Sequence, residues 1–166
     1  MNNIAYIDGQ NLYLWIQTEW WTIDLKKFRV YLKDKFGIQE AYYFLWYLSD
    51  ETQDLYSTLQ KAGFIVLFRE HTSALKGKKK GNVDVDIVFE IMRRIIEEKD
   101  FDKIVLVSGD GDYIKLVKYL ILKGILQKIL FPNNNNSSLY NKLGNKYYSY
   151  LGDVKSKISY NKKRGS

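Results

Sequence analysis

The chain alternates short apolar runs with longer amphipathic segments, and glycine ends many of these segments. Runs such as 4–8, 64–68 and 103–107 have the length and composition of buried strands. Segments such as 25–36 and 83–98 carry apolar residues at the helical period. Strands that alternate with helices form a parallel sheet covered on both faces. The sequence therefore predicts an α/β fold with three layers, in which the central sheet is mainly parallel.

The apolar runs and amphipathic segments predict the positions of the strands and helices along the chain. We expect strands at 4–8, 40–48, 64–68, 103–107 and 127–131. We expect helices at 11–16, 25–36, 50–61, 83–98 and about 112–124, with a further helix from about 138. A short extended stretch near 147–150 and a basic tail complete the chain. The central sheet should thus contain about five strands.

Composition limits the chemistry that is open to the chain. It has no cysteine and a single histidine, which excludes disulfides, thiolate nucleophiles and a multi-histidine zinc site. Any bound metal must take oxygen ligands, and these suit hard ions such as Mg²⁺ or Mn²⁺. No apolar run reaches the roughly 18 to 20 residues that span a bilayer, and the N-terminus lacks the features of a signal peptide. We therefore expect no membrane partner and a cytoplasmic location.

Four aspartates fall where their side chains would meet at one edge of a parallel sheet. Asp8 ends the first strand, Asp110 and Asp112 follow the fourth, and Asp84 opens the helix after the third. Ligands of such sheets bind beyond the carboxyl ends of the strands. Gathered carboxylates repel one another, and divalent ions relieve this repulsion while activating water for phosphodiester hydrolysis. The alternative for each aspartate alone is a role in capping a helix or ending a strand.

Helical phase ranks the acids of segment 83–98. Apolar residues follow Asp84 at i+3, i+4, i+7 and i+11, which places Asp84 on the stripe that packs against the sheet. Asp86 lies about 200° away around the helix, nearer the solvent. Glu90 is also off the Asp84 face, and an exposed pair with Arg94 is its simplest explanation. Asp84 is therefore the first candidate ligand, and Asp86 and Glu90 come second.

Asn11 lies three residues after Asp8, in the first turn of the expected helix. An amide at this position can orient a water or a phosphate oxygen near a metal. The alternative is that Asn11 only caps the helix.

Three segments resemble the motifs of the NYN domain family, which comprises PIN-like nucleases with a Rossmann-like sheet. Residues 7–11 match the I-D-x-x-N motif at the end of the first strand. Residues 80–84 match the K-G-x-D motif with one additional residue before the acid. Residues 108–113 match the S-G-D-x-D-[FY] motif. The order and the placement of these motifs agree with the family over nearly the whole chain.

The resemblance implies a ribonuclease that depends on Mg²⁺ or Mn²⁺, in which Asn11 assists the metal ligands Asp8, Asp84, Asp110 and Asp112. A family position six residues after the helix-opening acid is often acidic and corresponds to Glu90, so Glu90, Asp86 and Ser108 are further candidates. The resemblance also implies a PIN-like nuclease domain over residues 1–155, followed by a basic, disordered tail at 156–166.

The net charge of +7 favours a polyanionic partner such as RNA, whether single-stranded or structured. Lys76, Lys78, Lys79 and Lys80 lie just before Asp84 and suit phosphate contacts, although a solvated surface loop has the same composition. The tryptophans at 15, 20 and 21 can stack on unpaired bases, pack in the core or form a homodimer contact.

Two other functions fit parts of the pattern. A non-catalytic RNA-binding module would share the basic loop and the acids. A small-molecule phosphohydrolase of the haloacid-dehalogenase kind also begins with a strand-terminal aspartate. That class needs a second aspartate two residues later, where this chain has Gln10.

Overall fold

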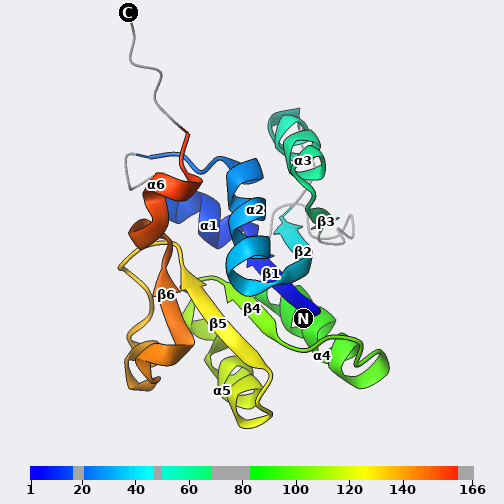
Figure 1. The fold of residues 1–166 in the computed structure, drawn as a ribbon, viewed down its shortest axis with the longest axis vertical. Coiled ribbons are helices and arrows are strands. Elements are labelled where there is room, and N and C mark those ends of the chain that lie inside the picture. The colour runs from blue at the N-terminus through cyan, green and yellow to red at the C-terminus, as the bar shows by residue number, and fades with distance from the viewer. Residues whose placement is uncertain (17–20, 47–49, 69–82, 161–166) are drawn as a thin grey trace, which may run out of the picture.

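A six-stranded, fully parallel sheet forms the centre of the molecule, with helices on both faces (Figure 1). The computed structural model describes residues 1–16, 21–46, 50–68 and 83–160. The strands are β1 (Asn3–Asp8), β2 (Ile38–Leu45), β3 (Ile65–Phe68), β4 (Ile104–Val107), β5 (Leu126–Phe131) and β6 (Tyr148–Tyr150). The helices are α1 (Gly9–Ile16), α2 (Leu25–Phe36), α3 (Asp50–Ala62), α4 (Val83–Glu97), α5 (Ile114–Leu122) and α6 (Lys155–Ile158). The predicted three-layer α/β architecture is confirmed.

The C-terminal part of the sheet differs from the prediction in two places. The extended stretch near 147–150 is a sixth strand, β6, which pairs in parallel with β5 from Ile129 to Phe131. The helix expected from about 138 is instead a short 3-10 helix, Ser138–Lys142, whose preceding Ser137 accepts a hydrogen bond from the Leu139 N–H. No helix in the described ranges is long and apolar enough to cross a membrane.

The strand order β3-β2-β1-β4-β5-β6 places β1 and β4 side by side at the middle of the sheet. The chain runs outward from β1 through β2 to β3, and then returns to β4 on the other side of β1. Ligands of doubly wound sheets bind where the winding reverses, beyond the carboxyl ends of the strands. In this molecule that place lies after Asp8 of β1 and Val107 of β4.

Buried side chains of β1 point alternately into two apolar layers, as the two-residue period of a strand requires. Ala5 and Ile7 join the layer that includes residues of α2 and α6. Ile4 and Tyr6 join the layer that includes residues of α4 and α5. Burial on both faces explains why the central strands are continuous apolar runs in the sequence.

The C-terminal segment packs onto this framework beyond the boundary that we expected. The predicted tail begins at residue 156, whereas α6 continues to Ile158, which is fully buried. Ser159 then forms an antiparallel bridge with Ile23, and its carbonyl accepts a hydrogen bond from the Lys27 ammonium at 3.0 Å. Residues up to 160 are therefore part of the fold, and 161–166 lie outside the described residues.

Candidate metal centre

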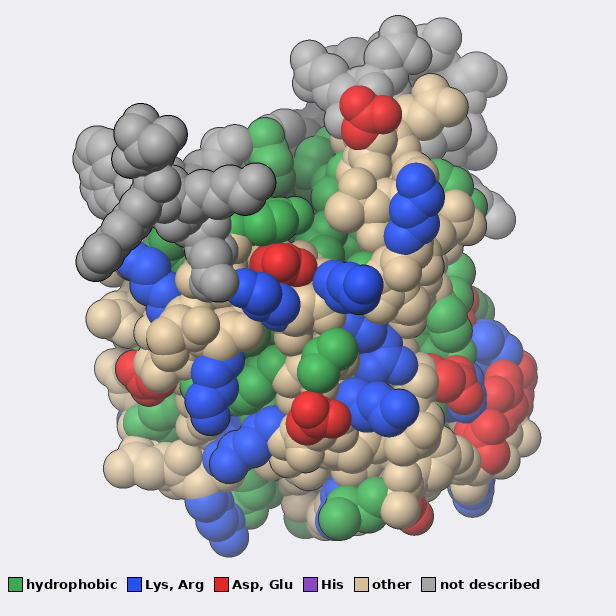
Figure 2. Space-filling model, turned by 45° about the horizontal axis from the view of Figure 1, so that its top comes forward, with side chains coloured by type: hydrophobic (Ala, Val, Ile, Leu, Met, Phe, Trp, Pro, Cys, Tyr) green, Lys and Arg blue, Asp and Glu red, His purple; other side chains and the backbone are tan. Residues whose placement is uncertain are grey.

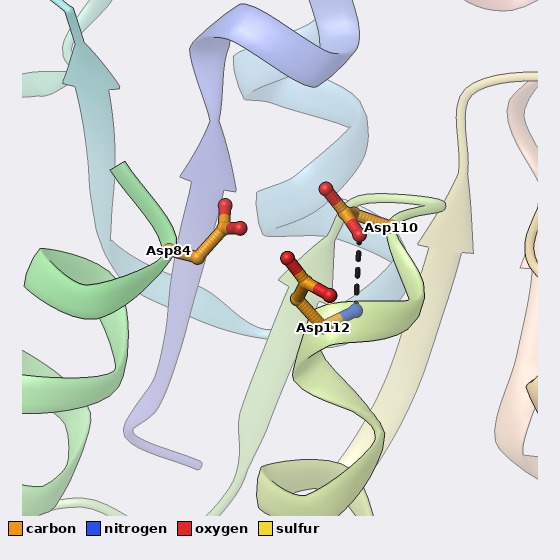
Figure 3. A group of neighbouring side chains, drawn as sticks. All are labelled: Asp84, Asp110 and Asp112. Atoms are coloured by element: carbon orange, nitrogen blue, oxygen red, sulfur yellow. Dashed lines mark hydrogen bonds between the residues drawn. The ribbon is translucent and has the colours of Figure 1, made fainter. Parts of the chain in front are cut away.

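Three carboxylates meet beyond the carboxyl ends of β1 and β4. One oxygen each of Asp84, Asp110 and Asp112 lies within 4.8 Å of the other two. Asp84 comes from the first turn of α4, Asp110 follows β4, and Asp112 belongs to the 3-10 helix Gly111–Tyr113. Figure 3 shows the Asp84 side chain directed toward the other two aspartates. The structure thus brings together three of the four aspartates expected at this edge.

The turn after β4 holds Asp110 through several hydrogen bonds. The Asp110 N–H donates to the Ser108 hydroxyl at 3.1 Å, and the Asp110 carboxylate accepts from the Asp112 N–H at 3.0 Å. The Tyr140 hydroxyl donates to the Asp110 carbonyl. At Gly111 a Cβ atom would collide with the Ser137 side chain, so only glycine lets the two segments come this close. Asp110, rather than Asp112, therefore has the capping role in this turn.

Asp8 lies beneath the cluster and is almost fully buried. Its Oδ1 accepts a hydrogen bond from the Asn11 N–H at 3.0 Å, and its Oδ2 accepts one from the Tyr113 hydroxyl at 3.0 Å. The pKa of Asp8 is raised, mainly because burial disfavours the charged form. A side chain at Gly9 would collide with the Phe44 carbonyl, so glycine allows the chain to leave β1 along this path. Asp8 is not one of the three clustered carboxylates.

Tyr113 connects Asp8 to the cluster. Its buried hydroxyl lies 3.0 Å from Asp8 Oδ2 and 3.0 Å from Asp84 Oδ1. A phenol carries one proton and donates to one carboxylate at a time. The second contact is a hydrogen bond when Asp8 or Asp84 is itself protonated and donates to the phenol oxygen. Burial raises the pKa of Tyr113, so this hydroxyl stays protonated. Tyr113 was not among the predicted site residues, although it stands at the aromatic position of the third motif.

Asn11 joins the ends of β1 and β4. Its side-chain carbonyl accepts a hydrogen bond from the Gly109 N–H at 2.9 Å. This contact fixes the turn that carries Asp110 against the first turn of α1. Since the side-chain oxygen of Asn11 binds protein backbone, the structure gives the amide a positioning role in the site.

The lower-ranked candidates Asp86, Glu90 and Ser108 are not among the three clustered carboxylates. Asp86 is half-buried, and its Oδ2 has no hydrogen-bond partner among the described residues. Glu90 pairs with Arg93 at 3.0 Å, so the expected pair with Arg94 is wrong. Ser108 is buried and contributes through its contact with the Asp110 backbone.

The remaining RNA-binding candidates are the basic loop and three of the four tryptophans. Residues 76–80 lie outside the described residues, as do Trp20 and the side chain of Trp15. Trp21 is buried in the core layer that includes α2 and α6, with the Lys155 ammonium 5.7 Å from its ring centre. Of the alternatives for the tryptophans, Trp21 therefore takes the core role.

The clustered carboxylates fit a hard divalent cation. Mg²⁺ binds oxygen at about 2.1 Å in octahedral geometry, so ligand atoms around one ion lie about 3.0–4.2 Å apart. The three oxygens, which lie within 4.8 Å of one another, need only a small side-chain movement to reach this range. Burial and the charge of Asp8 raise the pKa of Asp84 to about 7. A cation would offset the repulsion that raises this pKa. Asp84, Asp110 and Asp112 are therefore the residues that could hold such an ion.

The metal-free Asp84→Asn variant should be more stable than the wild type at pH 8, and the difference should vanish toward pH 4. The folded state raises the pKa of Asp84 from 3.8 to about 7, so ionisation of this carboxyl group disfavours the folded state. The wild type has its full stability below pH 4, where Asp84 is protonated, and loses this part of it as the pH rises through 7. Three pKa units correspond to about 4 kcal/mol, and solvent screening reduces this to about 1–2 kcal/mol. The amide oxygen of the introduced asparagine would still accept the Tyr113 hydrogen bond. Urea unfolding in chelator at pH 5 and pH 8 measures the difference in free energy of unfolding between the variant and the wild type. An equal difference at both pH values would contradict the expectation.

Comparisons with known proteins relate the chain to a known fold and a known family. The crystal structure of a protein of unknown function from Vibrio parahaemolyticus has the same fold, with a TM-score of 0.77 and 20% sequence identity over 96% of each chain. Low amplitude and bright protein LabA of Synechococcus elongatus is 24% identical over 127 residues, which cover 71% of this chain and 67% of LabA. The sequence profile of the NYN domain matches residues 4–150, a range that contains Asp8 and all three clustered aspartates. The chain therefore belongs to the NYN domain family.

Proposed function

We propose that this protein is a metal-dependent ribonuclease that hydrolyses RNA phosphodiester bonds beyond the carboxyl ends of β1 and β4. The observation that carries the proposal is the convergence of Asp84, Asp110 and Asp112, whose oxygens lie within 4.8 Å of one another. Membership of the NYN family, whose fold is nuclease-like, supports the same conclusion. The site stands at the switch point of the sheet, where doubly wound folds bind their ligands.

In this proposal Asp84, Asp110 and Asp112 hold Mg²⁺ or Mn²⁺, and Asp8 assists from beneath. Such an ion, when bound, lowers the pKa of water and stabilises negative charge on the phosphate. The chain's own residues fix the geometry. Tyr113 orients the Asp84 carboxylate, and Asn11 and Ser108 hold the backbone that presents Asp110.

The surface charge supports an RNA partner. Figure 2 shows Lys and Arg side chains gathered on the face of the molecule that carries α2. Lys26, Lys27 and Lys35 of α2 and Lys157 of α6 line a hollow of about 520 Å³ there, together with Asp34. A basic surface attracts the phosphate backbone irrespective of base sequence. In the proposal, the lysines at 76 and 78–80, which precede Asp84 in the sequence, add further phosphate contacts.

Incubation of the purified protein with a panel of single-stranded and structured RNAs tests the proposal. We expect cleavage with Mn²⁺ or Mg²⁺ and none with chelator, because the clustered carboxylates repel one another and the substrate phosphate without a cation. Electrophoresis of end-labelled RNA measures the products. Binding without cleavage across all RNAs and both metals would contradict a ribonuclease and indicate a non-catalytic RNA-binding module.

A further inference from the structure

A hollow of about 530 Å³ opens beside the candidate metal centre, between the first turn of α4 and the start of α5. Asp84 and Asp112 line it, so it is continuous with the acidic cluster. Figure 3 shows these two aspartates between α4 and the helical segment that leads into α5. The rest of the lining is mainly apolar, with one basic side chain: Val85, Val88, Ile114, Leu139 and Lys115. A ligand in this hollow would touch both carboxylates and apolar walls.

Two of the four apolar side chains that line the hollow are well exposed to solvent. Val85 is 65% exposed and Leu139 is 55% exposed. Phe89 lies one turn after Val85 on α4 and is also exposed. Exposed apolar side chains carry a cost of about 25 cal/mol per Å² relative to burial. Adjacent ones that flank a polar site mark a surface that a ligand covers.

The chemistry of the lining matches one nucleotide of a single strand. A nucleobase has an apolar face that packs against aliphatic and aromatic side chains, and its phosphate is anionic. Lys115 is exposed and offers a positive charge at the rim. A base that is stacked and paired within a duplex cannot enter such a hollow without leaving the stack.

We propose that this hollow holds the unpaired base of the nucleotide next to the phosphate bound at the acidic cluster. This inference rests on the proposed ribonuclease function and adds a preference for single-stranded RNA. Val85 and Leu139 provide the contact area, and Lys115 contacts the flanking phosphate. The site recognises the shape and apolar face of a base, so it tolerates different base sequences.

The test compares two labelled probes, a mixed-sequence RNA hexamer and a hexamer of the same backbone that lacks the bases. Fluorescence anisotropy in Ca²⁺, which takes oxygen ligands, measures binding. We expect the wild type to bind the base-containing probe at least about fivefold more tightly, a difference of about 1 kcal/mol, because the aliphatic lining buries apolar area of one base. The Val85→Ser, Leu139→Ser double variant should lose this preference.

Two exposed apolar residues outside the hollow provide matched controls. Ile96 lies near the far end of α4 and is 69% exposed, and Leu122 ends α5 and is 81% exposed. The Ile96→Ser, Leu122→Ser double variant should keep the full preference for bases. Circular dichroism of both double variants checks that the fold is retained.

Each outcome separates the hollow from the ribonuclease activity. Equal binding of both probes by the wild type, or no binding of either, would overturn the inference, and so would an unchanged preference in the Val85→Ser, Leu139→Ser variant. If the wild type prefers bases but cuts no RNA with Mn²⁺ or Mg²⁺, the proposed function fails and the base site stands. If the wild type cuts RNA and the Val85→Ser, Leu139→Ser variant has an unchanged KM, the inferred base site is wrong and the proposed ribonuclease function is retained.

Discussion

The Asp110→Asn variant should cleave RNA about 10²–10³-fold more slowly than the wild type while keeping its fold. Asparagine retains the side-chain oxygen that accepts the Asp112 N–H at 3.0 Å, so the turn after β4 should persist. It removes one of three negative charges within 4.8 Å of one another. The variant therefore loses affinity for the cation and the charge stabilisation that the cation supplies.

Single-turnover rates on labelled RNA with Mn²⁺ measure this loss, and the melting temperature in chelator checks the fold. Asp54→Asn is the matched control, because it removes one carboxylate from an exposed position on α3. The control should cleave at the wild-type rate. An Asp110→Asn protein that cuts RNA as fast as the wild type would show that Asp110 is not part of the site.

The sequence predicts the position of the acidic cluster because strand ends and helix starts are local features. Parallel strands carry their carboxyl ends to one edge, so Asp8 and Asp110 had to lie near one another once the strand order was known. The phase of segment 83–98 favoured Asp84 over Asp86 as the residue that faces the sheet. In the structure Asp84 meets Tyr113, whereas Asp86 is half-buried and has one buried oxygen, so it lies less close to the solvent than the phase suggested. The second inference uses only spacing along the chain, and the first also needs the rule that ligands bind at the carboxyl ends of parallel strands.

Contacts between distant side chains do not follow from spacing. Tyr113 reaches Asp8 across 105 positions of the sequence, and only the packed structure shows that one hydroxyl serves two carboxylates. The sequence indicated an extended stretch near 147–150, but its pairing with β5 as the sixth strand, β6, depends on a distant segment. Arg94 was expected to pair with Glu90 on the same helix. A long guanidinium side chain can reach other elements as easily as its own helix, so helical spacing could not exclude those partners.

Arg94 joins three separate segments at the opposite edge of the sheet from the acidic cluster. Its side chain is only 8% exposed and donates to Asp100 at 2.8 Å and to Glu40 at 3.2 Å. It also contacts the Tyr42 hydroxyl, which lies on β2 with Glu40. The guanidinium lowers the pKa of Glu40 through these hydrogen bonds. This network ties the end of α4 to the start of β2 and to the loop before β4.

Arg94→Met should lower the free energy of unfolding by about 2–3 kcal/mol at pH 7. Removing one partner of a buried ion pair costs about 3–5 kcal/mol, and the partly exposed Glu40 regains some solvation, which reduces the loss. Methionine keeps much of the side-chain volume, so the effect reports the lost charge. Glu40 has a lowered pKa, so its ionised form stabilises the folded wild type above its unfolded pKa, and this stabilisation is lost as the pH falls through the folded pKa. The difference in free energy of unfolding between the wild type and Arg94→Met should therefore become smaller in acid.

Urea unfolding measures the effect of Arg94→Met, with Arg93→Met as the control. Arg93 pairs with acids on the exposed side of α4, so its replacement should have little effect on the free energy of unfolding. The two variants remove the same charged group from adjacent positions of one helix, so they differ mainly in the burial of that group. Equal losses in the two variants would show that burial of Arg94 adds nothing.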